Sequence, residues 1–292
     1  MGAMKILVCT DGTAASRSIL PHAGRLARAI GAELVLARVL DPRVDAAAEV
    51  GPKLEDAVAK VQAAWEAELR AFLADAGLEG SALVPHREWG KEIADAIHKA
   101  ADEAGAALIA LASRGAGKVH HALFGSVAMG VIQRADLPVM TLATHDAAPR
   151  EGSGPYHIVV TTDGSPDSRS IFEGLRPLLV PGKVKVTLLQ VVEMDLKETE
   201  EEARARALPA VEALLSRLPV GVEASARVEV VPAHSDVSAC IGETARELGA
   251  DAIASATHGY SARRHVVAGS VALGVVEKSG LPVILVKSKP VD

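Results

Sequence analysis

The feature of this 292-residue sequence that most constrains its fold is an internal repeat. Three short motifs occur twice. Thr10–Gly12 recurs 152 residues later as Thr162–Gly164. The other two recur 144 residues later: Gly125–Ala128 as Gly269–Ala272, and Leu137–Val139 as Leu281–Val283. The smaller offset implies that the second copy has lost eight residues, and residues 41–53, whose counterpart 193–197 is shorter, are the expected place.

The repeat predicts two domains of about 140 residues, in keeping with ordinary domain sizes. The first spans residues 1–144 and the second residues 155–292. Residues 145–154 between them are polar, contain Gly and Pro and show no apolar period, so they are interpreted as a linker.

Each copy alternates short apolar runs with longer amphipathic segments, which is typical of parallel βαβ units. The predicted strands are 5–9, 33–40, 82–85, 107–111, 139–142, 157–160, 183–192, 226–231, 252–255 and 283–286. The predicted helices are 16–30, 54–76, 91–104, 126–134, 168–179, 196–218, 236–248 and 270–278. The fold class is therefore α/β, with two tandem doubly wound domains that each have helices on both faces of a parallel sheet.

Composition excludes several functions. A net charge of −6 and an aromatic content of 2 % argue against a nucleic-acid partner, which needs basic or stacking side chains. The apolar run 106–112 is far too short for a membrane span, and residues 1–8 lack a signal-peptide layout, so we expect a cytoplasmic protein without a membrane partner. The two cysteines, Cys9 and Cys240, are expected to pack as small apolar side chains.

The loop after the first strand of each copy carries an Asp, at Asp11 and Asp163. In a doubly wound sheet, ligands bind at the carboxyl ends of the strands where the winding reverses. A carboxylate there can accept hydrogen bonds from a ribose or a base, or it can simply form a turn and a helix cap. Both interpretations stay open at this point.

The loop after the fourth strand has the same spacing in both copies. Gly115 is followed by nine residues and then Gly125-Ser126, and Gly259 is followed by nine residues and then Gly269-Ser270. Gly-Ser at the start of a helix suits a phosphate, because free N–H groups, the helix dipole and a hydroxyl converge there. It can equally be an ordinary N-cap.

These paired motifs, together with the Leu-Pro-Val that precedes the fifth strand, resemble the universal stress protein family, with two such domains covering nearly the whole chain. Nucleotide-binding members share the pattern Gly-x2-Gly-x9-Gly-Ser/Thr. In this sequence Ala112 and Ala256 replace the first glycine, and Cys9 and Thr161 replace a proline that usually lies two residues before the Asp.

The resemblance implies the strand order 3-2-1-4-5 in each domain and ATP, with Mg²⁺ as an option, as the ligand. It places Asp11 and Asp163 against the nucleoside and Val39 and Val191 beside the adenine. Phosphate would then rest on the N–H groups that open the helix after the fourth strand. Those groups belong to Ser126 and Val127 in the first copy and to Ser270 and Val271 in the second.

Further residues could take part in binding or could serve only the structure. A set of loop cations could either neutralise phosphate or be solvated: Lys118, His120, His121, Arg263, Arg264 and His265. Trp65 and Trp89 are interpreted as packing residues, and no metal-ligand spacing is present.

Three functions remain open: a stress-response protein with adenine nucleotide as a regulatory ligand, an interaction protein with degenerate pockets, and a slow ATP hydrolase. The last lacks an evident general base, so no catalytic residue is predicted. The two copies are expected to associate as a pseudo-dimer within the chain through residues 139–142 and 283–286, with a homodimer as a further option.

Overall fold

The protein is described by a computed structural model that covers residues 3–46, 54–113, 124–143, 148–150, 152, 154–164, 170–195, 197–257 and 269–287. Its internal contacts divide the chain into two compact units, Met1–Ala135 and Asp136–Asp292. Strand β5 (Val139–Leu142), which ends the first sequence repeat, groups with the second unit. The domain limits expected from the repeat stay a prediction.

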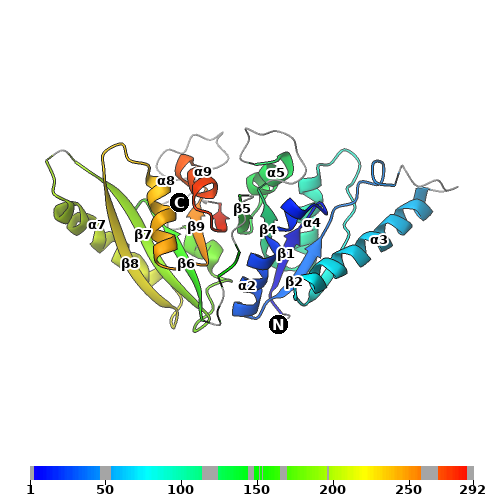
Figure 1. Cartoon of the computed structure of the whole chain (residues 1–292), viewed down its shortest axis with the longest axis horizontal. Helices are drawn as coiled ribbons and strands as arrows, with labels where there is room; N and C mark the ends of the chain where they lie inside the picture. The colour runs from blue at the N-terminus through cyan, green and yellow to red at the C-terminus, as the bar shows by residue number, and fades with distance from the viewer. Residues whose placement is uncertain are drawn as a thin grey trace. The chain divides into compact units, whose positions relative to one another are not determined.

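The first unit is built on a parallel sheet (Figure 1). Its strands are β1 (Lys5–Cys9), β2 (Glu33–Ala37), β3 (Gly80–Leu83) and β4 (Ala106–Ala112). They lie in the order β3-β2-β1-β4. Strands β1 and β4 are continuous apolar runs and are buried almost throughout. This burial shows that the sheet is covered on both faces, as is usual for a parallel sheet.

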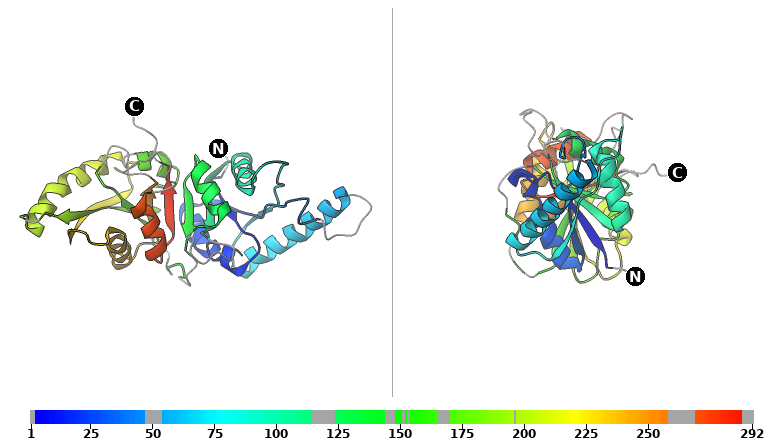
Figure 2. Two further views of the ribbon diagram at one scale, coloured as in Figure 1. Left: turned by 90° about the horizontal axis from the view of Figure 1, so that it is seen from above. Right: turned by 90° about the vertical axis from the view of Figure 1, so that its right-hand side faces the viewer.

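Helices cover both faces of this sheet. They are α1 (Ala14–Arg17), α2 (Leu20–Ile30), α3 (Leu54–Asp75), α4 (Ile93–Ala104) and α5 (Ser126–Arg134). In the view from above, α2 and α3 lie on one face while α4 and α5 lie together on the other (Figure 2). This is the doubly wound arrangement that the sequence predicts.

The single helix predicted over 16–30 is wrong, because the structure breaks it into α1 and α2. Pro21 lies in the first turn of α2, where its missing N–H costs nothing. In the middle of a longer helix the same ring would clash with the carbonyl of Arg17 and remove a hydrogen bond. The helix therefore restarts at Leu20.

The second unit repeats the pattern. Its strands are β6 (Tyr156–Thr161), β7 (Val184–Met194), β8 (Glu223–Pro232), β9 (Ala252–Ala256) and β10 (Val283–Val286). Its helices are α6 (Ile171–Leu175), α7 (Glu200–Leu214), η2 (a 3₁₀ turn, Leu215–Arg217), α8 (Val237–Glu247) and α9 (Ser270–Lys278). Figure 2 shows α8 and α9 together on one face of this sheet and α7 on the other.

The predicted strand order is confirmed. The second unit has β8-β7-β6-β9-β10, which is 3-2-1-4-5 in the numbering of one repeat, and the first unit shows the same order for its first four strands. Within the second unit β5 adds to β10 as an antiparallel neighbour, with Met140 opposite Ile284. The two segments expected to pair do so, and any wider association of the copies stays a prediction.

Two predicted helices of the second copy are shorter than expected. The helix predicted over 196–218 begins at Glu200, because Thr199 and Glu202 form a reciprocal capping box there. The helix predicted over 168–179 is present as α6, residues 171–175, and residues 165–169 lie outside the described part.

A buried histidine makes the second unit sensitive to pH. His157 in β6 is 2 % exposed, and its Nε2 lies 2.9 Å from Thr187 Oγ1. Burial lowers the pKa of His157 below its usual 6.5, nearby Lys185 acts in the same direction, and Asp251 opposes them. The folded unit therefore holds this ring neutral at a pH where the unfolded chain binds a proton.

We expect the second unit to lose stability as the pH falls through about 6.5, by up to about 1.4 kcal/mol per pH unit from this one group. Denaturant unfolding at pH 7.5 and 5.5 should show a smaller loss in His157→Gln than in the unsubstituted chain. Equal losses in the two proteins would contradict the assignment.

Candidate functional site

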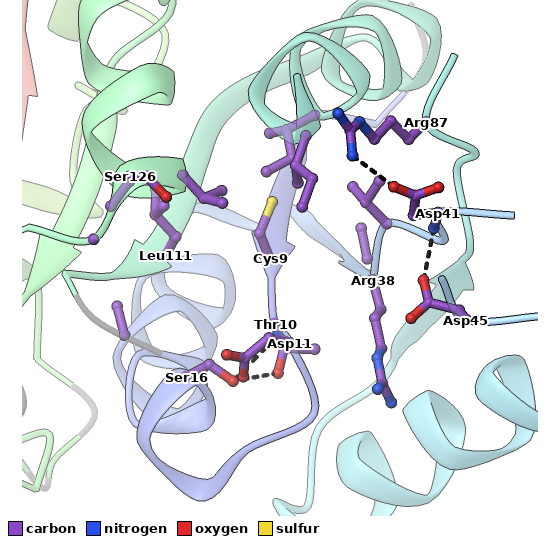
Figure 3. A pocket seen from close by; sticks show the side chains of 18 of the residues that line it. Cys9, Thr10, Asp11, Ser16, Arg38, Asp41, Asp45, Arg87, Leu111 and Ser126 are labelled. Atoms are coloured by element: carbon purple, nitrogen blue, oxygen red, sulfur yellow. Dashed lines mark hydrogen bonds and ion pairs between the residues drawn. The ribbon is translucent and has the colours of Figure 1, made fainter. Parts of the chain in front are cut away.

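The first unit contains a cavity of about 770 Å³ where the carboxyl ends of β1, β2 and β4 meet the start of α5 (Figure 3). Five of the six residues predicted for the nucleotide site of the first copy line it: Asp11, Val39, Gly125, Ser126 and Val127. The cavity lies where strand order reverses between β1 and β4, which is the expected ligand crevice of a doubly wound sheet.

The loop after β1 is organised by short side chains. Asp11 Oδ1 accepts hydrogen bonds from Thr13 N at 3.0 Å and from Thr13 Oγ1 at 2.6 Å. Thr13 in turn caps α1 by accepting from Ser16 N at 3.2 Å. The turn-and-cap interpretation of Asp11 is therefore correct, and it is compatible with a ligand role because the exposed Asp11 also lines the cavity.

The end of β4 is tied directly to the start of α5. Gly125 N donates to Ser113 O at 2.8 Å. Gly125 is the N-cap residue of α5, and it provides no side-chain cap for the first-turn N–H groups. The N-terminus of α5, the positive end of its dipole, therefore lies at the cavity wall, and no side chain in the described part of the chain caps it.

Glycine is not needed at position 125 for its backbone angles. Its φ is −70°, and a Cβ there would meet only Ser113 O, at 3.9 Å. Ala112, which replaces a family glycine, lies in β4, and among described residues the only non-glycine with positive φ is His234. Alanine therefore causes no backbone strain at position 112.

The β2 side of the cavity carries charged residues that the sequence interpretation did not single out. Arg38 follows β2, and its guanidinium carbon lies 3.6 Å from the centroid of the Trp65 ring of α3. Arg38 Nη1 also donates to Glu68 Oε2 at 2.8 Å. Trp65 also lines the cavity, so it is more than a packing residue. Trp89 is 78 % exposed, and the Arg43 guanidinium lies over its ring, so it packs at the surface and not in the core.

A second ion pair fixes the outer wall of the cavity. Arg87 Nη1 donates to Asp41 Oδ2 at 2.5 Å, and the Asp41 N–H donates to Asp45 at 2.7 Å. Desolvation acts to raise the pKa of Asp41, but hydrogen bonds from the Arg43 N–H and from Arg87 outweigh it and hold that pKa below its usual value. Asp41 is therefore an anion at neutral pH.

The second copy places its predicted residues at equivalent positions. Asp163 follows β6, Val191 lies in β7, and Gly269, Ser270 and Val271 open α9. The hydrogen bond between the two elements is repeated too, since Gly269 N donates to Thr257 O, and Gly269 provides no side-chain cap for α9. The helix-terminus half of the site is thus built twice.

Part of the predicted site cannot be compared with the structure. Gly115, Gly259 and the six loop cations at 118, 120, 121, 263, 264 and 265 lie outside the described residues. Within the described residues no group of three or more His, Cys, Asp and Glu side chains is placed to hold a metal. Every described helix is too short or too polar to cross a membrane.

Comparison with known proteins agrees with this architecture. The family model of the universal stress protein family matches twice, at residues 3–142 and 156–287. No curated protein matches the sequence.

Two solved structures share the fold over nearly the whole chain. A universal stress protein from Archaeoglobus fulgidus DSM 4304 is 20 % identical with a TM-score of 0.64, over 97 % of this chain and 96 % of that one. A putative universal stress protein from Pseudomonas aeruginosa UCBPP-PA14 is 17 % identical with a TM-score of 0.59, over 98 % and 94 %. A shorter universal stress protein, solved in complex with cAMP, is 24 % identical with a TM-score of 0.38, over 50 % and 100 %. The chain therefore belongs to the universal stress protein family and carries two of its domains in tandem.

Proposed function

We propose that this protein is a cytoplasmic stress-response protein that binds ATP or a related adenine nucleotide as a regulatory ligand. The first cavity is the principal site, and the equivalent surface of the second unit is a further one. The observation that carries the proposal is that the cavity wall offers donors on one side and an acceptor on another. The donors are at the N-terminus of α5, whose N-cap residue Gly125 has no side chain to satisfy them, and the acceptor is the carboxylate of Asp11.

That arrangement matches the chemistry of a nucleotide. Phosphate oxygens accept hydrogen bonds, so they suit the N–H groups and hydroxyl of Ser126 and the N–H of Val127 at the positive end of the helix dipole. Ribose hydroxyls donate hydrogen bonds, so they suit Asp11. A volume of about 770 Å³ lies within the usual range of small-molecule sites.

The test is direct. Purified protein is denatured, and the released material is examined by ultraviolet absorbance and mass spectrometry for adenine nucleotide. Nucleotide-free protein is then titrated with ATP, AMP, cAMP and adenosine in a calorimeter, with and without Mg²⁺. We expect binding of at least one nucleotide in the micromolar range, about 8 kcal/mol, and weaker binding of adenosine, which lacks phosphate. No heat at millimolar nucleotide with folded protein would favour the interaction-protein alternative.

A further inference from the structure

The two copies differ at the residue that precedes the valine proposed for the adenine. This residue comes directly after β2 in the first copy and lies within β7 in the second. Thr10, Asp11 and Val39 correspond to Thr162, Asp163 and Val191, so Arg38 corresponds to Gln190. The structure supports this equivalence independently. A Cβ on Gly12 would lie 2.8 Å from Arg38 Nη1, and a Cβ on Gly164 would lie 3.5 Å from Gln190 Nε2. In each copy this side chain therefore packs against the glycine that follows the site Asp.

Among the residues that the structure describes, this side chain lies on an aromatic ring in the first copy alone. Arg38 stacks on Trp65 and donates to Glu68, and both partners come from α3. The covering helix of the second copy, α7, contains no aromatic residue. The stack and one hydrogen bond already hold the planar guanidinium in place, so a ligand that binds it loses little further side-chain entropy. Gln190 lacks such a stack on its covering helix α7 and would lose more.

Arg38 retains donors for a ligand. Of its side-chain nitrogens only Nη1 has a hydrogen-bond partner among the described residues, while Arg38 itself lines the cavity. Figure 3 shows Ser126 at the upper left and the Arg38 side chain running downward on the right, with Thr10 and Asp11 between them across the view. Arg38 thus lies away from the helix terminus proposed for phosphate.

The charge around Arg38 indicates what kind of group it would meet. Glu68 lies 2.8 Å away and balances the guanidinium, and the cavity wall adds the carboxylates of Asp11 and Asp41. A further phosphate beside these carboxylates would be repelled. A neutral acceptor, such as a ribose oxygen or a purine ring nitrogen, meets no such repulsion.

Building on the proposed nucleotide site, we infer that Arg38 is a specificity-determining residue of the first unit. From its stack on Trp65 it donates a hydrogen bond to a neutral acceptor on the sugar or base. The first unit therefore binds the nucleoside part more tightly than the second, where Gln190 takes its place.

The full chain offers a probe for this site alone. Its two tryptophans are Trp65 and Trp89, so Trp89→Phe leaves Trp65 as the only one, on the wall of the first cavity. In that background AMP and ATP are titrated while the Trp65 emission is recorded, and calorimetry repeats each titration. Arg38→Met removes the donors and keeps an apolar stem on the ring.

We expect Arg38→Met to weaken AMP and ATP by the same factor, at least about 5-fold, because the lost contact is on the part they share. The matched control is Arg17→Met, which removes a guanidinium from another aromatic ring of α3, that of Phe72, outside the cavity lining. It should change both affinities less than 2-fold, and thermal unfolding should show similar stability for the two variants.

Other results would overturn the inference in distinguishable ways. Affinities within 2-fold of the unsubstituted protein would show that Arg38 does not touch the ligand. A much larger loss for ATP than for AMP would place Arg38 at the phosphates and contradict the neutral acceptor. Absence of any binding to the chain with Arg38 in place would reject the proposed nucleotide site itself, and this inference with it.

Discussion

Replacing Ser126 with Asp is expected to weaken ATP binding in the first cavity by at least about 100-fold while the fold becomes slightly more stable. Ser126 is the first residue of α5, which has no acidic residue in its first turn. A carboxylate there interacts favourably with the helix dipole, by about 0.3–1 kcal/mol. The same carboxylate would occupy and repel the proposed phosphate position, and a loss of about 2.7 kcal/mol corresponds to the 100-fold effect.

Calorimetry and thermal unfolding on the same sample measure both effects, so a binding loss cannot be confused with unfolding. Ser126→Ala, which removes only the hydroxyl, should cost a few-fold because the N–H donors remain. Ser270→Asp makes the same change at the start of α9 and should leave the first cavity unaffected. If Ser126→Asp binds ATP as the unsubstituted protein does, phosphate does not rest on α5.

The second large effect is expected on stability, at the crossing of α8 and α9 in the second unit. Gly274 of α9 lies directly on Ser238 of α8, and a Cβ on Gly274 would come within 2.7 Å of the Ser238 Cβ. Gly242 of α8 is similarly close to the end of α9, since a Cβ on Gly242 would lie 2.9 Å from the Ser279 Cα. The helices pack this closely only because these side chains are small or absent.

Gly274→Val should therefore destabilise the second unit by about 3 kcal/mol or more, since the branched side chain would force the two helices apart. Denaturant unfolding measures this loss. Glu277→Val is the matched control, because it places the same residue on an exposed position of α9 and should cost well under 1 kcal/mol. Gly274→Ala alone is then compared with the double variant Gly274→Ala, Ser238→Gly. If the double variant is the more stable of the two, the loss comes from contact between the side chains at positions 274 and 238. Equal losses in the two valine variants would contradict it.

Much of the fold followed from the sequence because its signals are local. The helices 126–134 and 270–278 and the strands 139–142 and 283–286 have the predicted limits. Each begins after a Gly or Pro and continues with a regular apolar pattern, so neighbouring residues contain the whole signal. The positive φ of Gly12, +90°, is another local property, since an Asp-Gly turn requires it.

The part of the candidate site that depends on strand order could also be predicted from the sequence. Strand order places the ends of β1, β2 and β4 at one edge, so Asp11, Val39 and the start of α5 had to come together. Their proximity depends on topology alone and needs no knowledge of side-chain packing.

Tertiary structure alone decided the rest. Arg38 and Trp65 lie on different elements, and nothing in the residues around either one indicates that the guanidinium stacks on the indole ring. The need for glycine at position 274 likewise arises only from Ser238, 36 residues earlier in the chain. The repeat, the strand order and the helix caps can be predicted from patterns in the sequence. The walls of the cavity and the crossing of two helices depend on which side chains from different elements come into contact, and spacing along the sequence does not determine those contacts.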